Sequence, residues 1–272
     1  AVVVTPRQPD ESVNVSDTHP LAEAGVLLAG TAALFAVVTL IAVFAINILL
    51  GLVSPATEVR WLSGWEPGFE VEDSSEREAV QALLDRLARH WQTDYTFSVQ
   101  IMPESDPNAL ALPGGYIYVT RGLLDQVESE NELAFVLAHE LGHYEGRDHI
   151  RQLGRAAVIG LFFAAASGSG AKNTGFVTDL TLRNFSRAQE TAADAFGLSL
   201  VQAEYGHVAD ADQFFTKIAD GDNTMLDSYA GTHPAPASRI TALRALAQQS
   251  GWSLTGTTTP WAPSDFQSET NP

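Results

Sequence analysis

The chain has 272 residues, a hydrophobic content of 45%, a formal net charge of −18 and no cysteine. This length is enough for one domain of ordinary size with appendages. The lack of cysteine excludes disulfide bonds, thiolate metal ligands and a cysteine nucleophile, and the acidic surface argues against nucleic acid as a partner.

The N-terminal part of the chain predicts a membrane anchor. Residues 1–23 are polar and proline-containing, which indicates an extended tail. Residues 24–53 carry no charged side chain and exceed the ~20 residues that a helix needs to cross a bilayer. The apolar run is too long for a signal peptide and follows an acidic tail. We therefore expect a single transmembrane helix. Arg7 lies before this run and Arg60 after it, so the positive-inside rule nearly ties and the orientation is weakly determined.

Residues 54–73 contain proline and glycine and are predicted to be a connector. A helix follows from Ser75, and Phe97 to Ile101 alternates as a strand does. A Pro-Gly-Gly turn at 113–115 precedes a second strand, Tyr116–Thr120. A sheet edge there would let an extended peptide add as a further strand, although an ordinary hairpin explains this stretch equally well. The candidate substrate-binding residues are Gly114, Gly115, Tyr116, Ile117 and Tyr118.

The sequence His139-Glu140-Leu141-Gly142-His143 carries the clearest chemistry. It lies in an apolar helix that Ser129 and Glu132 would start as a capping box. Histidines at i and i+4 share one helix face, and two neutral imidazoles suit Zn²⁺. Glu140 beside them can accept a proton from a water that the metal activates. Two histidines and a glutamate also reach this spacing by chance, but a mostly apolar helix disfavours that explanation.

A second helix from Arg187 to about Tyr205 carries Glu190 and Asp194 on one face. One carboxylate could complete a zinc site, and the other could hold a ligand histidine. Taken alone, two solvated acids at a helix start are the simpler explanation. Ala156–Ala166 is apolar but short, which favours a core or interfacial helix, and Ser167–Gly175 is a Gly/Ser loop.

Four separated segments together resemble the M48 family of zinc metallopeptidases, which includes the Ste24, HtpX and Oma1 types. The segments are NALALPGG-x-I-x-V-x-x-GLL (108–124), HELGH (139–143), E-x-x-A-D (190–194) and THP-x-x-x-x-RI (232–240). Four motifs in this order are specific, and the resemblance covers roughly residues 70–248. Other family members have several membrane spans, so the single span here resembles a bacterial type with one anchor.

The resemblance implies roles for individual residues. His139, His143 and Glu190 correspond to the zinc ligands, with one Zn²⁺ per chain, and Glu140 to the general base. Asp194 is similar to an acid that orients a ligand histidine. His233 resembles a residue that stabilises the oxyanion, and Arg239 one that supports the site. Asn108 matches a position near the substrate cleft.

These observations predict a mainly α fold with a small β-sheet (α+β). A zincin-like (gluzincin) peptidase domain at 74–252 would follow the anchor, and residues 253–272 would form a flexible tail. We expect an endopeptidase of protein quality control or processing in the bacterial inner membrane, its domain facing the periplasm, that binds peptide substrates as extended strands.

Two alternatives remain open. His139, His143, Gly146 and His149 also fit the metzincin pattern, in which His149 would be the third ligand, although Met225 is a poor match to a Met-turn. In the preferred interpretation, His149 lies on a helix that continues through Leu153. The second alternative is a membrane-anchored peptide-binding protein that does not cleave, but none of the residues that cleavage requires is missing.

Overall fold

The computed structural model describes residues 19–62, 69–72, 75–167, 185–220, 232–233 and 236–262. Most of the predicted N-terminal tail, the Gly/Ser loop after Ser167 and the end of the C-terminal tail lie outside the described residues. The chain forms two units, Ala1–Ala45 and Ile46–Pro272.

Helix α1, Pro20–Gly51, begins in the first unit. It is long and apolar enough to cross a membrane, and none of its residues is buried in protein. It starts four residues before the apolar run predicted from the sequence, because Pro20 is well suited to the first helical position and Glu23 to the first turn.

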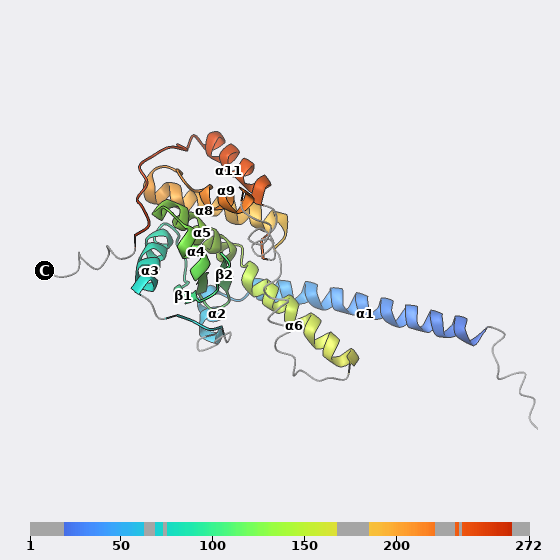
Figure 1. The fold of residues 1–272 in the computed structure, drawn as a ribbon. Coiled ribbons are helices and arrows are strands. Elements are labelled where there is room, and N and C mark those ends of the chain that lie inside the picture. Colours follow the sequence, from blue (N-terminus) through green and yellow to red (C-terminus); the bar gives the residue numbers. More distant parts are fainter. Residues whose placement is uncertain are drawn as a thin grey trace, which may run out of the picture. The chain divides into compact units, whose positions relative to one another are not determined.

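The second unit is mainly helical with a small sheet, as the sequence predicts (Figure 1). Its helices are α2 (Pro55–Leu62), α3 (Ser75–Ala88), α4 (Arg121–Gln126), α5 (Glu130–Glu145), α6 (Asp148–Ser167), α8 (Arg187–Tyr205), α9 (Gln213–Asp220) and α11 (Pro236–Ser250). Its strands are β1 (Ser98–Met102), β2 (Ala109–Leu112) and β3 (Tyr116–Thr120).

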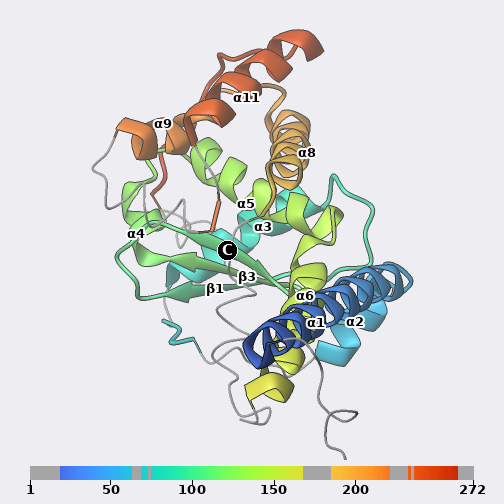
Figure 2. The same ribbon diagram turned by 90° about the vertical axis from the view of Figure 1, so that its right-hand side faces the viewer.

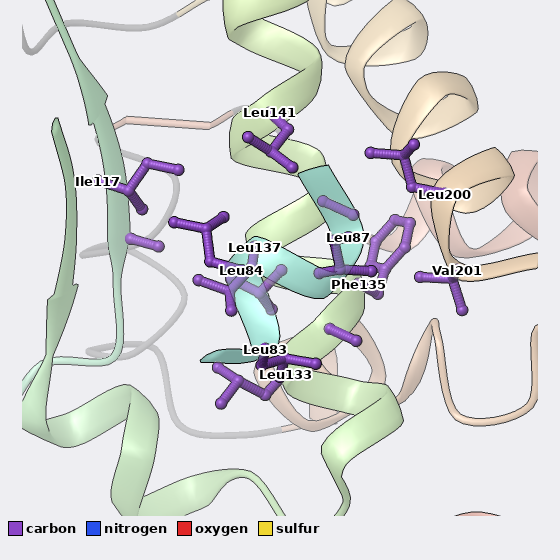
Figure 3. Close-up of a cluster of buried hydrophobic side chains, with 14 of the residues drawn as sticks. Leu83, Leu84, Leu87, Ile117, Leu133, Phe135, Leu137, Leu141, Leu200 and Val201 are labelled. Carbon is purple, nitrogen blue, oxygen red and sulfur yellow. The ribbon is translucent and has the colours of Figure 1, made fainter. Parts of the chain in front are cut away.

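Helix α5 is the centre of this unit. The Ser129 side chain accepts from the Glu132 amide and starts the helix, as predicted. Every residue from Glu130 to Tyr144 is buried. The sheet lies on one side of α5, and α8, α9 and α11 lie on the other (Figures 1 and 2). Figure 3 shows the core between them, where leucines of α3 and α5 meet Ile117 of the sheet and Leu200 and Val201 of α8.

Two glycines allow α5 and α8 to approach closely. A Cβ on Gly142 would lie 2.6 Å from the Ala193 Cα, and one on Gly197 would lie 2.9 Å from the His139 amide nitrogen. Neither distance is possible for a larger residue without movement of the backbone. The missing side chains therefore bring the acids of α8 within reach of the histidines of α5.

The sheet has the order β1-β3-β2, with β1 parallel and β2 antiparallel to β3. The expectation that a peptide adds along the Tyr116–Thr120 edge is wrong, because β3 is the central strand and has a partner on both sides. Glu72 bridges to Ile101 on the outer side of β1. Among the described residues, the outer edge of β2 has no strand partner.

His149 lies on a helix that continues through Leu153, as expected, but this helix is α6, which starts at Asp148; Gly146 caps α5, and Arg147, with a φ of 55°, separates the two helices. Two further expectations need correction. The connector contains the helix α2. The expected tail is hydrogen-bonded to the domain as far as Trp261, whose amide donates to the Glu128 carbonyl. Packing against α5 thus orders a Thr- and Ser-rich segment that composition alone marks as loose.

Candidate active site

Four buried side chains meet between α5, α8 and the turn at residues 232–233. His139, His143, Glu190 and His233 each offer a ligand atom, and these atoms lie within 4.8 Å of one another. His139 Nε2 and His143 Nε2 are each 3.6 Å from a Glu190 oxygen. His233 Nδ1 is 3.0 Å from Glu190 Oε1 and 3.4 Å from His139 Nε2. The structure therefore brings together the two histidines and the distant glutamate that the sequence suggests.

The buried polar atoms of the site fit a metal ion. Among the described residues, His143 Nε2 and Glu140 Oε2 are buried and have no hydrogen-bond partner. A buried polar atom without a partner costs about 1–3 kcal/mol, so such atoms call for an explanation. His143 Nε2 faces the cluster, because its Nδ1 is held by Asp148. Imidazole nitrogens and carboxylate oxygens are the donors that a catalytic Zn²⁺ site uses.

Each α5 histidine has its own carboxylate partner on Nδ1. Asp194 Oδ1 lies 3.0 Å from His139 Nδ1, as expected for an orienting acid. Asp148 Oδ2 lies 3.1 Å from His143 Nδ1, and the Gln189 side chain donates to the other Asp148 oxygen. A carboxylate on the second ring nitrogen fixes the tautomer and direction of a ligand histidine. The sequence analysis missed Asp148, because only the break in the helix at Arg147 turns its side chain back toward His143.

Arg239 joins the two acids of α8. Its Nε and Nη2 donate to Asp194 at 2.9 and 2.6 Å, and its Nη1 lies 2.8 Å from Glu190 Oε2. Its guanidinium carbon lies 4.1 Å from the centre of the Phe215 ring. A guanidinium that donates to two carboxylates fixes their positions relative to each other. Arg239 therefore contacts both acids, and its role in supporting the site stays a prediction.

Burial and neighbouring charges together set the ionisation of the site. Burial raises the pKa of Glu140, which makes its carboxylate a stronger base. Burial, together with the Arg239 charge, places the pKa of His139 well below its ordinary value, so the ring is neutral and able to bind a metal. Burial alone would raise the pKa of Glu190, but His233, His139 and Arg239 outweigh it and hold that pKa at about 2. Glu190 is therefore ionised at neutral pH.

The residues expected to bind substrate have different positions. The Asn108 side chain accepts from Thr232 Oγ1 at 3.3 Å and links the start of β2 to the turn that carries His233. Ile117 and Tyr118 are buried, and Tyr116 packs against Met102 and Leu112. Gly114 and Gly115 have φ near 95° and form the tight turn between β2 and β3. The sequence analysis missed Ala111 of β2, whose backbone amide interacts with the Glu140 carboxylate.

His149 lies outside the four-residue cluster. Its Nε2 is 2.7 Å from Glu58 Oε1, and its Nδ1 is 3.3 Å from the His143 carbonyl. Both ring nitrogens of His149 therefore have partners outside the cluster of His139, His143, Glu190 and His233.

Comparisons with known proteins agree with this geometry. The model of peptidase family M48 matches residues 74–247, which is more than half of the chain. The chain is 32% identical over 168 residues to the mitochondrial metalloendopeptidase OMA1 of Schizosaccharomyces pombe. It is 33% identical over 204 residues to a putative β-barrel assembly-enhancing protease of Vibrio cholerae. It is 28% identical over 164 residues to a protease HtpX homolog of Salinibacter ruber.

These alignments cover 59%, 66% and 51% of this chain, respectively. They cover 50%, 40% and 56% of the three relatives. The chain thus spans about half the length of the curated relatives that it matches.

Proposed function

Because the chain belongs to peptidase family M48, we propose that it is a zinc-dependent endopeptidase anchored in a membrane by residues 24–53. The observation that carries the proposal is the buried meeting of His139, His143 and Glu190 beside Glu140. The relatives named as metalloendopeptidase and protease support the same reaction class.

In this proposal His139, His143 and Glu190 hold one Zn²⁺ per chain. Asp194 and Asp148 orient the two histidines, and Arg239 positions Glu190 and Asp194. A bound zinc ion would supply Lewis-acid polarisation of the scissile carbonyl and a lowered pKa for the attacking water. The chain itself supplies the base, the orientation of the ligands and a site from which bulk water is excluded.

Glu140 is proposed as the general base and later as the acid. Its carboxylate accepts the proton of the attacking water and passes it to the leaving amine. A raised pKa suits both steps, because a base whose pKa lies nearer the working pH also returns its proton readily. His233 Nε2 lies 3.7 Å from Glu140 Oε1. Burial would lower the pKa of His233, but Glu190 and Glu140 together raise it above its ordinary value. A protonated His233 would stabilise negative charge on the tetrahedral oxygen.

The peptide is proposed to lie along the outer edge of β2. Among the described residues this edge has no strand partner, and its Ala111 amide lies against the Glu140 carboxylate. An extended peptide that pairs with such an edge is held through its main chain, so it is recognised with little regard to sequence. Such binding suits protein quality control or processing, in which many substrates share only an unfolded segment.

The proposed location is the bacterial inner membrane, with the peptidase domain on the periplasmic side. Long acidic domains translocate largely independently of their charge, so the second unit can lie on the periplasmic side. Protease digestion of spheroplasts tests the assignment. A domain that is digested while the membrane is intact agrees with it, and a domain protected until lysis contradicts it.

The test of the reaction compares the purified protein with Glu140→Gln. We expect about one zinc ion per wild-type chain and cleavage of an unstructured protein such as casein. Glu140→Gln should keep the metal, since Glu140 is not proposed as a ligand, and lose cleavage. Metal analysis and a cleavage assay measure both quantities. Proteolysis that survives in Glu140→Gln would rule out the mechanism.

A further inference from the structure

A second buried carboxylate lies away from the metal cluster. Glu58 of α2 has no exposed surface, although α2 belongs to the short segment between the anchor and the domain. Its Oε1 lies 2.7 Å from His149 Nε2 and accepts from the Gly114 amide at 3.3 Å. Its Oε2 accepts from the Tyr95 hydroxyl at 2.7 Å and from Arg147 Nη2 at 2.9 Å.

These four partners come from parts of the chain that are far apart in sequence. Gly114 is in the β2–β3 turn, Arg147 and His149 follow the C-terminal end of α5, and Tyr95 precedes β1. A carboxylate accepts several hydrogen bonds at once, so one buried glutamate can join all of them. Helix α2 also packs directly against the β2–β3 turn, because a Cβ on Gly114 would lie 3.1 Å from the Leu62 Cβ at the end of α2.

The backbone at Arg147 depends on the same carboxylate. Arg147 adopts a φ of 55°, a left-handed conformation that is unfavourable for a residue with a side chain. Its guanidinium donates to Glu58 and to the Val53 carbonyl, which ties this turn to the segment after α1. The strained turn in turn places Asp148 against His143. Contacts with α2 thus hold the residue on which the break between α5 and α6 depends.

The same contacts reach the proposed substrate edge. Tyr144, next to His143 on α5, donates its hydroxyl to the carbonyls of Tyr116 and Leu112, which flank the β2–β3 turn. Its ring lies 4.1 Å from the His149 ring, between centroids. Glu58 thus accepts from the Gly114 amide within the turn, and Tyr144 donates to the residues at its two ends. Ala111, one residue before Leu112, is the β2 residue that meets Glu140.

We propose that Glu58 is a positioning residue for peptide hydrolysis, which fixes the β2–β3 turn against the end of α5 and so aligns the substrate edge with Glu140. The inference rests on the proposed function. It also makes α2 a working part of the catalytic unit, although the family match begins only at residue 74.

The experiment uses the full-length protein in detergent and the variant Glu58→Gln. An amide cannot accept from all four donors, so we expect the turn to loosen. Since a misplacement of about 1 Å can cost 10²-fold in rate, kcat/KM for labelled casein should fall about 10- to 100-fold. Metal content should stay at the wild-type level. Amide hydrogen exchange should become faster in residues 109–118 and stay unchanged in α8.

A matched control makes the same chemical change on the surface. Glu128→Gln alters a side chain that is 77% exposed, and it should leave activity and exchange unchanged. Wild-type turnover together with wild-type exchange in Glu58→Gln overturns the proposal. The exchange measurement needs no catalysis, so an inactive wild-type protein would remove the proposed function and still leave the role of Glu58 in the turn testable.

A second variant covers the case in which Glu58→Gln unfolds the domain, seen as faster exchange in α8 as well. Glu58→Asp keeps the charge for Arg147 but withdraws it by one methylene from the Gly114 amide. Faster exchange confined to 109–118, with reduced turnover and retained metal, supports the proposal. Unchanged exchange and turnover in Glu58→Asp overturns it.

Discussion

Glu190 and Glu58 are both buried glutamates that contact a histidine and an arginine, but the groups around them differ. Glu190 lies 3.0 Å from His233 Nδ1 and 2.8 Å from Arg239 Nη1. Glu58 lies 2.7 Å from His149 Nε2 and 2.9 Å from Arg147 Nη2. For each, burial would raise the pKa, and the neighbouring groups instead hold it at about 2.

The difference is in which buried atoms each cluster leaves without a hydrogen-bond partner. Beside Glu58, among the described residues, such an atom is Arg147 Nε, a donor that cannot bind a metal. Each oxygen of Glu58 has two donors from the chain itself. Beside Glu190, His143 Nε2 and Glu140 Oε2 have no hydrogen-bond partner among the described residues. A carboxylate whose oxygens are all hydrogen-bonded by the chain fixes the packing around it, whereas an imidazole nitrogen and a carboxylate oxygen left without partners side by side fit a metal and its water. Composition alone would not separate these two clusters.

The largest expected effect tests whether the cluster of His139, His143 and Glu190 binds the metal without His149. Glu190→Ala should lose zinc during dialysis, because it removes one of the three proposed ligands. His149→Ala should keep zinc, because the His149 ring contacts Glu58 and the His143 carbonyl. Metal analysis after dialysis measures both variants. If His149→Ala empties the site and Glu190→Ala stays loaded, the comparison is reversed and the metzincin alternative replaces the M48 ligand set.

The next effect tests the hydrogen bonds around Glu58 through the stability of the fold at acid pH. The pKa of Glu58 falls from an ordinary value of 4.5 to about 2 on folding. A depressed carboxylate pKa stabilises the fold above the unfolded value and loses that contribution as the pH falls through the folded value. The contribution is of order 3 kcal/mol at neutral pH.

We therefore expect Glu58→Gln to be less stable than wild type at pH 7, and the difference should shrink between about pH 4.5 and pH 2. Urea unfolding of both proteins after removal of metal measures this difference. A difference that stays constant over this pH range would show that the carboxylate is not held in its ionised form.

The smallest expected effect concerns the two acids that contact His139 and His143. Asp194→Asn and Asp148→Asn should each weaken zinc binding about 10- to 100-fold, as is typical of groups that orient a ligand histidine. The two losses should be of similar size, because each acid contacts one histidine Nδ1 at 3.0–3.1 Å. Competition with a chelator measures them. A loss for Asp194→Asn alone would mean that Asp148 only closes the turn after α5.

Local patterns determined much of the site in advance. The i and i+4 spacing places His139 with His143, and Glu190 with Asp194, on single helix faces, because one turn of α-helix decides this. The start of α5 at Ser129 is equally local. The run from residue 24 to 53 likewise gives an apolar helix from composition alone. The motif order added the association of Glu190 with the histidines, and the structure places them together.

Tertiary structure decided the rest. Among the described residues, β2 has no strand partner on its outer edge, because β1 pairs with β3 from a distance in sequence, which no alternation pattern encodes. Asp148 reaches His143 because the chain turns at Arg147, and that turn is held by Glu58 from α2. A carboxylate in a connector helix looks like an ordinary exposed acid in the sequence. Its burial depends on four donors supplied by separate segments, so its role exists only once those segments have been packed against one another.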